Sequence, residues 1–300
     1  MEMPTLRQLK MLCLLAETER FGETANRLGI AQSAVTAGIR ALEERLGLSL
    51  FDRGRHGARL TPAGESVLAR ARRIVADVED LERFASRDAA QLGGKIRLGC
   101  LPTVGPYLLP RATPRLHADF PDLKLVVREA AVTGLRQLLM DSVVDAILTV
   151  RPEFEGVDGE ELFAESVHLA MPPDDDLARK DSICVSDMNG RDLLTLGDDH
   201  QLGRLTQRFA EQAGARVRTD YLGTSLDALR LMVSMGTGLA LMPQLYILSE
   251  IEGRDDVIVR PIESVHASRT LHLLWLKRSG RADDYRRLAE TIRRAAAETV

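Results

Sequence analysis

Apolar residues recur with helical spacing in residues 33–46, at successive steps of four, three and four positions. This spacing places them on one face of an α-helix and leaves polar residues on the other. Ser33 is a favoured N-cap residue for this helix, and Gly47 suits the position just past its end. A shorter helix is predicted over residues 23–28, closed by Gly29, so the segment forms two helices and a tight turn. The apolar positions are Val35, Ile39, Leu42 and Leu46.

The polar face of the predicted helix 33–46 carries amide, hydroxyl, methyl and guanidinium groups. These are the groups that read base edges and phosphates in the major groove of DNA. We therefore predict a DNA-binding helix-turn-helix, which makes gene regulation the first hypothesis for function. The candidate DNA-contacting residues are Gln32, Ser33, Ala34, Thr36, Ala37 and Arg40.

A wing is predicted to follow the helix-turn-helix. Residues 48–51 and 59–60 have the pattern of two short strands around a glycine-containing turn at 54–57. Cationic side chains on such a wing suit contacts to phosphates or to the minor groove, although a solvated charged turn is the alternative. The candidate wing contacts are Arg53, Arg55 and Arg59.

An additional helix is predicted to start at Thr5, where Thr5 and Gln8 form a T-x-x-Q capping box. Together with the hairpin and the wing it makes a winged helix-turn-helix domain over residues 1–61. This segment resembles the N-terminal signature of LysR-type transcription regulators, although Thr36 stands where many members have Ser. The alternative is an amphipathic hairpin that only packs, which the continuation into a wing and a long helix disfavours. The matching positions are Ala25, Leu28, Gln32, Ser33, Ala34, Val35, Ile39, Leu42, Glu43, Leu46, Gly47, Leu50, Phe51 and Arg53.

A long helix is predicted from Thr61-Pro62, an N-cap residue followed by proline at the first helical position, to about Gln91. Its apolar residues alternate steps of four and three, which is a heptad seam that favours a partner helix. Residues 62–92 would then correspond to the dimerisation linker helix of the LysR-type family. Packing on the chain's own C-terminal body is the alternative. The seam consists of Val67, Ala71, Ile74, Val78, Leu81 and Ala85.

From residue 93 onward, short apolar strands alternate with helical segments, a pattern typical of parallel sheets covered by helices. The length predicts two lobes, the first from residues 93–163 and 265–300 and the second from residues 164–264. The fold class is therefore α/β: a winged helix-turn-helix and a linker helix, followed by a two-lobed effector domain resembling periplasmic binding proteins. Ligands of such folds bind between the lobes, near the carboxyl ends of strands.

Three segments near predicted strand ends are candidates for binding an effector. In the first, Thr103 is predicted to cap a helix whose backbone N–H groups could receive an anion. Helix capping alone is the alternative for Thr103, Thr224 and Ser225. The candidate effector-binding residues are Leu101, Pro102, Thr103, Val104, His200, Gln201, Thr224 and Ser225.

The stretches 101–110, 193–202 and 224–243 resemble the peroxide-sensing OxyR subfamily of LysR-type regulators. The resemblance implies that Gln201 stands where that subfamily has its peroxidatic cysteine, and Ala210 where it has the resolving cysteine. A carboxamide has no thiolate and cannot form a sulfenic acid or a disulfide. It does offer donors and an acceptor to a small polar or anionic effector, which is the main hypothesis. The alternative is a redox response at a different cysteine, such as Cys100.

The composition limits the other classes of function. The net charge is −4, but residues 1–64 hold nine basic and seven acidic residues whereas residues 151–199 hold four and fourteen. A basic end on an acidic body suits local DNA binding. The three cysteines are widely spaced, which predicts neither a zinc site nor a disulfide framework. No signal peptide or membrane-length apolar run is present, so a cytoplasmic protein without membrane association is expected.

Catalysis is not predicted, because the chain contains no GxSxG, HExxH or P-loop motif and needs no cofactor for the function proposed. His200 lies beside two aspartates, but no matching nucleophile accompanies it. The expected partners are double-stranded promoter DNA, a small-molecule effector and further copies of the chain, as a homodimer or homotetramer. RNA polymerase is a further candidate partner.

Overall fold

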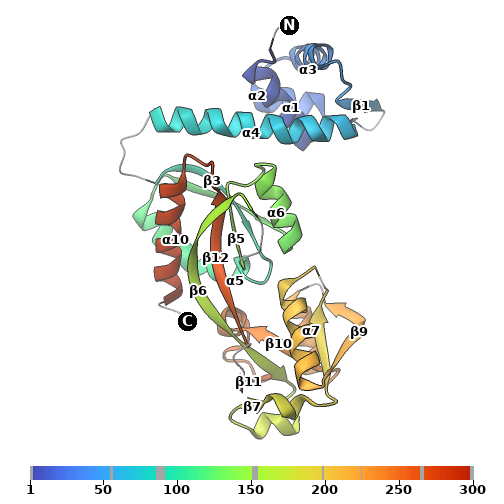
Figure 1. Cartoon of the computed structure of the whole chain (residues 1–300), viewed down its shortest axis with the longest axis vertical. Coiled ribbons are helices and arrows are strands. Elements are labelled where there is room, and N and C mark those ends of the chain that lie inside the picture. The colour runs from blue at the N-terminus through green and yellow to red at the C-terminus, as the bar shows by residue number, and fades with distance from the viewer. Residues whose placement is uncertain are drawn as a thin grey trace. The chain divides into compact units, whose positions relative to one another are not determined.

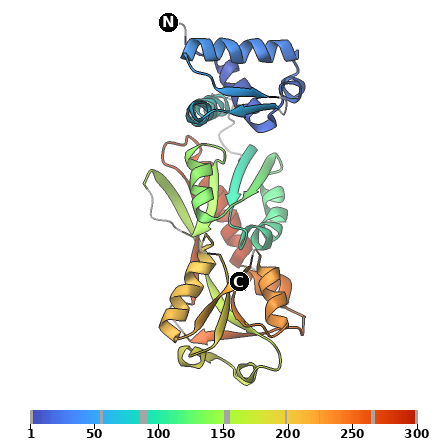
Figure 2. The ribbon, with the colours of Figure 1, turned by 90° about the vertical axis from the view of Figure 1, so that its right-hand side faces the viewer.

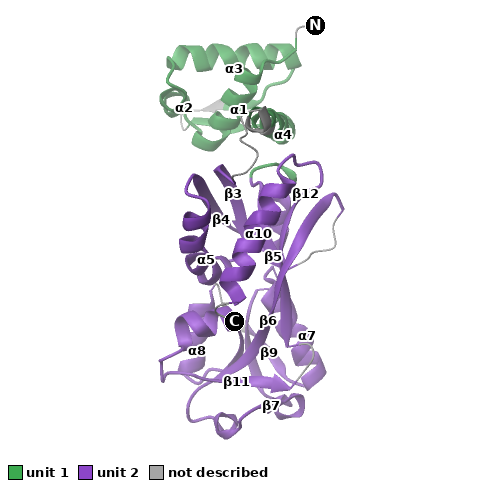
Figure 3. Cartoon of the chain, turned by 90° about the vertical axis from the view of Figure 1, so that its left-hand side faces the viewer, with its two compact units in different colours: residues 1–90, 140–143 green, residues 91–139, 144–300 purple. Residues whose placement is uncertain are grey.

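A computed structural model of the chain describes residues 3–54, 57–85, 92–150, 155–197, 199–223, 225–263 and 267–297. The chain divides into two compact units, residues 1–90 with 140–143 and residues 91–139 with 144–300 (Figure 3). Each unit has its own hydrophobic core.

The first unit contains a head of three helices, a two-stranded wing and one long helix (Figure 1). Val35, Ile39 and Leu42 from one face of the third helix are fully buried and pack in one cluster with Leu12 and Leu15. The predicted apolar stripe therefore forms the core of the head. The elements are α1 (Leu6–Thr18), α2 (Phe21–Leu28), α3 (Gln32–Leu46), β1 (Phe51–Gly54), β2 (Gly57–Leu60) and α4 (Pro62–Ala85).

Most predicted helix ends in the head are confirmed. Thr5 and Gln8 form the capping box at the start of α1. Gly29 and Gly47 end α2 and α3 in the left-handed conformation, with φ of 64° and 65°, which glycine adopts without steric strain. At the start of α4, Thr61 Oγ1 accepts a hydrogen bond from the Gly64 N–H at 2.9 Å.

The prediction that Ser33 caps the recognition helix is wrong. Helix α3 begins one residue earlier, with Ala31 in the N-cap position and no side-chain cap. The carbonyl of Ala31 accepts hydrogen bonds from the N–H groups of Ala34 and Val35, so the first turn closes ahead of Ser33. Ser33 therefore lies within the first turn, where its exposed hydroxyl is not used for capping.

The wing is present but shifted toward its turn. Strands β1 and β2 pair antiparallel, with Phe51 opposite Leu60, whereas the sequence predicted strands at 48–51 and 59–60. Figure 2 shows the two strands as short arrows beside the helices of the head. Arg55 lies outside the described residues.

Helix α4 is described as far as Ala85, and the predicted continuation to Gln91 lies outside the described residues. The seam residues of α4 differ in burial. Ala71 is buried in the head core, whereas Ile74 is 48% exposed and Leu81 is 64% exposed. Within one chain, Ile74 and Leu81 thus present much of their apolar side chains to solvent.

The second unit is built on one continuous sheet with the strand order β4-β3-β5-β12-β6-β10-β8-β9 and with β11 pairing with β6 and β7. The sheet is mixed, not parallel as predicted, because β6 and β12 run antiparallel to their neighbours. The strands are β3 (Gly94–Cys100), β4 (Leu123–Glu129), β5 (Ala146–Val150), β6 (Val157–Met171), β7 (Ile183–Cys184), β8 (Asp192–Leu196), β9 (Arg216–Gly223), β10 (Leu239–Pro243), β11 (Ile258–Glu263) and β12 (Ser268–Leu276).

Strand β6 belongs to both halves of this sheet. Its residues 157–166 pair with β12, and its residues 167–171 pair with β10 and β11 (Figure 1). We call the half with β3, β4 and β5 the first lobe and the half with β8, β9 and β10 the second lobe.

Helices accompany both lobes. Helix α10 packs on β6 and on α5 in the first lobe, and α7 and α8 pack on β8 and β9 in the second. None of the helices in the described ranges is both long and apolar enough to cross a lipid bilayer. The helices are α5 (Gly105–Asp119), α6 (Val132–Met140), α7 (Gln201–Ala213), α8 (Leu226–Ser234), α9 (Gln244–Tyr246) and α10 (Ala282–Ala297), with 3₁₀ turns at Asp176–Arg179 and Val185–Met188 and a π-helix at Ile247–Ile251.

Candidate DNA and effector sites

Helix α3 has two distinct faces. Its apolar stripe is buried, and the opposite face is open to solvent. Arg59 of β2 is also exposed. Nothing is described for the side chain of Arg53, although its backbone lies in β1. The predicted DNA-contacting residues of α3 are all at least partly exposed: Gln32, Ser33, Ala37 and Arg40 are exposed, and Ala34 and Thr36 are half-buried.

Arg40 is the principal cation on the open face of α3. Its Nε donates to Glu44 Oε1 at 2.9 Å, and the two side chains are 74% and 64% exposed. An exposed pair one helical turn apart stabilises a helix by only about 0.3–0.5 kcal/mol. The guanidinium can therefore leave Glu44 for a phosphate or a base edge at little cost.

The predicted effector segments all follow the carboxyl ends of strands. Residues 101–104 follow β3, His200 and Gln201 follow β8, and Ser225 follows β9. Ser225 caps α8 by accepting a hydrogen bond from the Ala228 N–H at 3.2 Å, as predicted. Thr224 lies outside the described residues.

Thr103 does not cap a helix, contrary to the prediction. Helix α5 starts at Gly105, and Val104 holds its N-cap position without a side-chain cap. Instead, Thr103 Oγ1 accepts a hydrogen bond from Arg269 Nη1 at 2.8 Å, and the Thr103 carbonyl accepts one from Arg269 Nη2 at 2.9 Å. The reason is that a buried guanidinium needs acceptors, and it takes both oxygens of Thr103.

Arg269 belongs to a buried network that the local sequence pattern did not predict. Its Nε donates to Glu165 Oε2 at 2.7 Å, and both side chains are fully buried. Glu165 Oε1 in turn accepts the backbone N–H of Leu245 at 2.7 Å. Arg269 and Glu165 lie opposite each other on β12 and β6, Thr103 belongs to the first lobe, and Leu245 follows β10 of the second. The network therefore joins both lobes at the point where β6 passes from one to the other.

A second set of contacts joins the lobes through α5. Arg111 Nη2 donates to the Leu248 carbonyl at 3.1 Å and to Ser249 Oγ at 3.2 Å. The ring of Tyr107 meets that of Tyr246 edge-on, with centroids 5.2 Å apart. Tyr246 also donates from its hydroxyl to Asp227 Oδ1 of α8 at 3.0 Å.

Gln201 begins α7, and His200 occupies the N-cap position without capping the helix through its side chain. The side-chain oxygen Oε1 of Gln201 is buried and has no hydrogen-bond partner within the described part of the chain. A buried acceptor without a donor is unfavourable by about 1–3 kcal/mol. No hydrogen bond among the described residues connects Gln201 or His200 to Thr103.

The side chains of Leu101 and Val104 are buried in the hydrophobic core of the second unit. A ligand at residues 101–104 would therefore meet the backbone of this segment and the half-buried Pro102.

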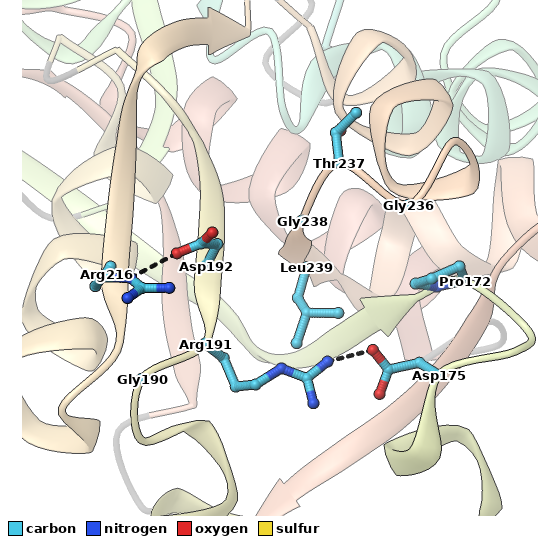
Figure 4. A pocket seen from close by; sticks show the side chains of 10 residues that line it. All are labelled: Pro172, Asp175, Gly190, Arg191, Asp192, Arg216, Gly236, Thr237, Gly238 and Leu239. Carbon is cyan, nitrogen blue, oxygen red and sulfur yellow. Dashed lines mark hydrogen bonds and ion pairs between the residues drawn. The ribbon is translucent and has the colours of Figure 1, made fainter.

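The opposite edge of the second lobe contains a pocket of about 240 Å³ that was not predicted (Figure 4). It lies at the amino ends of β8, β9 and β10, where Asp192, Arg216 and Leu239 begin these strands. Its charges are paired within the fold: Arg191 with Asp175, and Arg216 Nε with Asp192 Oδ1 at 2.8 Å.

The two edges of this lobe differ in electrostatics. Helices α7 and α8 end near the amino edge, where Gly190 and Gly236 line the pocket. Helix C-termini carry partial negative charge, which the arginines at this edge offset. The same helices begin at the carboxyl edge, beside His200 and Ser225, and helix N-termini favour anions. Helix polarity therefore favours negative charge at the carboxyl edge, where Asp227 already lies in the first turn of α8.

The cysteines differ strongly in environment. Cys100 is fully buried, and burial, followed by the nearby Glu129 carboxylate, raises the pKa of its thiol to about 12. Cys184 is exposed, and its hydrogen bond to Glu263 Oε2 at 3.3 Å raises the pKa of its thiol. The thiolate is the reactive form, so neither environment activates its cysteine.

We expect Cys100 to resist alkylation in the native full-length chain at neutral pH. With a pKa near 12, on the order of one thiol in 10⁵ is ionised at pH 7. Iodoacetamide labelling followed by mass spectrometry should modify exposed Cys184 first and Cys100 only after unfolding in urea. The thiolate of Cys100 becomes a substantial fraction of the thiol only when the pH approaches 12. Rapid native labelling at Cys100, by iodoacetamide or peroxide, would contradict this expectation.

Comparison with protein families decides the class of protein. Residues 6–65 match the model of the bacterial regulatory helix-turn-helix proteins of the lysR family, and residues 89–297 match the LysR substrate binding domain. The chain belongs to the LysR family. The predicted winged helix-turn-helix, the α/β effector domain and the function as a transcription regulator are thereby confirmed, and this family consists of regulators, not enzymes.

Relatives of this LysR-type regulator include proteins named as activators of hydrogen peroxide-inducible genes. A hydrogen peroxide-inducible genes activator of Pectobacterium carotovorum is 36% identical over 289 residues, covering 96% of this chain and 95% of that protein. The HTH-type transcriptional regulator EstR of Acinetobacter baylyi is 32% identical over 301 residues, with 98% of each chain covered. The resemblance to OxyR is therefore real, and it extends to a differently named regulator.

Solved structures give the same result. A variant of full-length OxyR from Pseudomonas aeruginosa matches with a TM-score of 0.83 at 29% identity, covering 97% of this chain and 98% of that one. An H2O2-bound variant of Corynebacterium glutamicum OxyR matches with a TM-score of 0.69 at 28% identity, covering 100% and 94%. This LysR-type regulator thus shares the whole architecture of OxyR and binds DNA and small molecules as an oligomer, as its family does.

Proposed function

We propose that this LysR-type regulator reads promoter DNA through α3 and its wing under the control of a small polar or anionic effector. The effector would bind at the carboxyl ends of β3, β8 and β9, between the lobes. The observation that carries this proposal is the buried Oε1 of Gln201 at the start of α7, to which no described residue donates a hydrogen bond. An effector with an O–H or N–H group would supply that donor.

The charge of the effector follows from the same edge. The first turn of α7 contains N–H groups without intrahelical partners and no acidic residue, and helix N-termini favour negative charge. The first turn of α8 already holds Asp227. Residues 101–104 add backbone groups from the first lobe. Contacts to both lobes would favour one relative arrangement of the lobes, and the effector's differential affinity for the two arrangements limits the size of the switch.

A thermal-shift screen of small hydroxy acids, amino acids and inorganic anions on the full-length chain tests this proposal. A ligand selective for the native state raises the melting temperature, by an amount that depends on its concentration relative to Kd. The Gln201→Ala variant should need at least about ten times more ligand to reach the same rise in melting temperature, because the polar side chain at the site is removed. Gln207→Ala, an exposed glutamine on the same helix, is the matched control. Equal responses in both variants would exclude the site.

Dimerisation is proposed to use the exposed half of the seam on α4. Ile74→Glu should shift the sedimentation profile toward monomer, because an unpaired carboxylate would become buried in the interface. Helix content should stay unchanged, since Ile74 is half-exposed in the single chain. Ser66→Glu, off the seam on the same helix, controls for added charge. An Ile74→Glu variant that remains oligomeric would show that another surface assembles the protein. Sedimentation of the wild-type protein shows whether it forms a dimer or a tetramer.

A redox response is the second candidate, favoured by relatives that are named hydrogen peroxide-inducible genes activators. It would need a reactive thiol in this chain. The proposed absence of a cysteine pair at Gln201 and Ala210, together with the buried Cys100, favours the small-molecule effector. The labelling of Cys100 described above separates the two.

RNA polymerase is the proposed partner at the promoter, because a DNA-bound regulator alters transcription through the enzyme that transcribes. A regulator of chromosomal promoters acts in the cytoplasm, where we place this chain.

A further inference from the structure

The pocket of about 240 Å³ at the amino ends of β8, β9 and β10 has no role in the function proposed above. We call it the amino-edge pocket (Figure 4). It lies at the opposite edge of the second lobe from Gln201, which begins α7 at the carboxyl end of β8. Two ion pairs and two apolar side chains line it, together with glycines and a threonine. The charged and apolar lining residues are Pro172, Asp175, Arg191, Asp192, Arg216 and Leu239.

The ion pairs of the amino-edge pocket leave hydrogen-bonding groups unused. Arg216 donates through Nε to Asp192 Oδ1 at 2.8 Å, and neither of its Nη atoms donates to a described residue. Arg191 donates through Nη2 to Asp175, so its Nε and Nη1 have no acceptor among the described residues. Asp192 Oδ2 accepts no hydrogen bond from the described part of the chain. One pocket thus offers guanidinium donors and a carboxylate acceptor at the same time.

These groups fit a ligand that carries both a negative and a positive charge. A carboxylate would accept from the remaining N–H groups of Arg191 and Arg216, since guanidinium N–H groups match the two oxygens of a carboxylate. An ammonium would donate to Asp192 Oδ2, and the C-terminal end of α8 beside Gly236 also favours positive charge. Two arginines and two aspartates give the lining no net formal charge. A zwitterion preserves this balance, whereas a simple anion or cation would add an unpaired charge.

The size and the apolar surface of the amino-edge pocket narrow the ligand further. Its volume of about 240 Å³ is smaller than the roughly 300–1,000 Å³ of pockets that bind drug-sized ligands. Leu239 is buried and Pro172 half-buried, and both favour an aliphatic group, because its burial removes apolar surface from water. We propose that the amino-edge pocket binds an α-amino acid with a small aliphatic side chain, as a second ligand site of this regulator.

Isothermal titration calorimetry of the full-length chain tests the proposal, with L-alanine, L-valine and L-leucine as the probes. We expect saturable binding of one amino acid per chain. Isovalerate is valine without the ammonium, and isobutylamine is valine without the carboxylate. Each should bind at least about tenfold more weakly than L-valine, because it leaves charged groups of the pocket without a partner.

Substitutions at one ion pair assign the binding to the pocket. Arg216→Met should lower the affinity for L-valine at least about tenfold, because charge-assisted hydrogen bonds to the carboxylate are lost. The fold should persist, since the Arg216 side chain is 70% exposed. Asp192→Asn should lower the affinity by a similar factor, because the ammonium loses its carboxylate. Arg208→Met, at an exposed arginine of α7 outside the pocket, is the matched control and should bind as the wild type does.

Gln201→Ala separates this site from the proposed effector site. Binding of L-valine that Arg216→Met weakens and Gln201→Ala leaves unchanged supports the proposal. Binding that only Gln201→Ala weakens would place the amino acid at the carboxyl edge and overturn it. Equal affinities for L-valine, isovalerate and isobutylamine, or no probe with a Kd below about 10 mM, would also overturn it. The proposed effector response at Gln201 does not depend on these results, so the two proposals fail separately.

Discussion

Arg269→Met is expected to lower the free energy of unfolding by about 3–5 kcal/mol, the range found when one partner of a buried ion pair is removed. Glu165 would keep its charge at a site where it is fully buried. Thr103 Oγ1 would lose the guanidinium that donates to it. Because the network joins both lobes, this destabilisation should appear in the effector domain, measured by urea unfolding of the full-length chain.

The double variant Glu165→Leu with Arg269→Met separates the burial of a charge from the loss of packing. Removing both charges should recover most of the stability, since apolar replacement of a whole buried pair is often neutral. Arg216→Met is the control, because Arg216 is 70% exposed in its pair with Asp192 and should contribute less than about 1 kcal/mol. If Arg269→Met is no more destabilising than Arg216→Met, the buried pair does not stabilise the junction.

Local signals predicted the head well for a physical reason. Capping boxes, left-handed glycines and apolar stripes act within one or two helical turns, so Thr5, Gly29 and Gly47 could be assigned from neighbours alone. Ser33 was misassigned because Ala31, which has no capping side chain, can still close the first turn through its backbone carbonyl. The polar face of α3 was predictable, since it follows directly from burial of the opposite face.

The junction of the lobes could not be predicted in this way. Thr103, Glu165 and Arg269 are far apart in the sequence and meet only because β6 pairs with β12 in the folded sheet. Nothing within the local pattern around Thr103 distinguishes a helix cap from an acceptor of a buried guanidinium. Glu165 is one of four acidic residues in β6, so its burial against Arg269 of β12 can be recognised only when the register of the two strands is known.

The chemistry of the effector edge was partly predictable. The strand ends and the starts of α7 and α8 follow from the alternation of strands and helices, which is why His200, Gln201 and Ser225 were selected. Whether Gln201 finds a partner depends on packing around α7, and only the structure shows its buried, unsatisfied oxygen. Leu101 and Val104 were selected because they follow the end of β3, and their side chains are part of the hydrophobic core.

Arg40→Ala with Arg53→Ala is expected to weaken operator binding by about 1–3 kcal/mol for each base or phosphate interaction that it removes, with the fold retained. Arg40 lies on the open face of α3 and is held only by an exposed pair with Glu44, so its removal leaves the head core untouched. In a gel-shift titration at several salt concentrations, removal of phosphate interactions should also reduce the slope of log affinity against log salt by about one for each of them.

The control is Arg208→Ala with Arg254→Ala, two exposed arginines of the effector domain, which removes the same total charge. If the control weakens binding equally, the effect is one of net charge. If the head variant retains both wild-type affinity and slope, α3 and the wing do not form the DNA-binding surface.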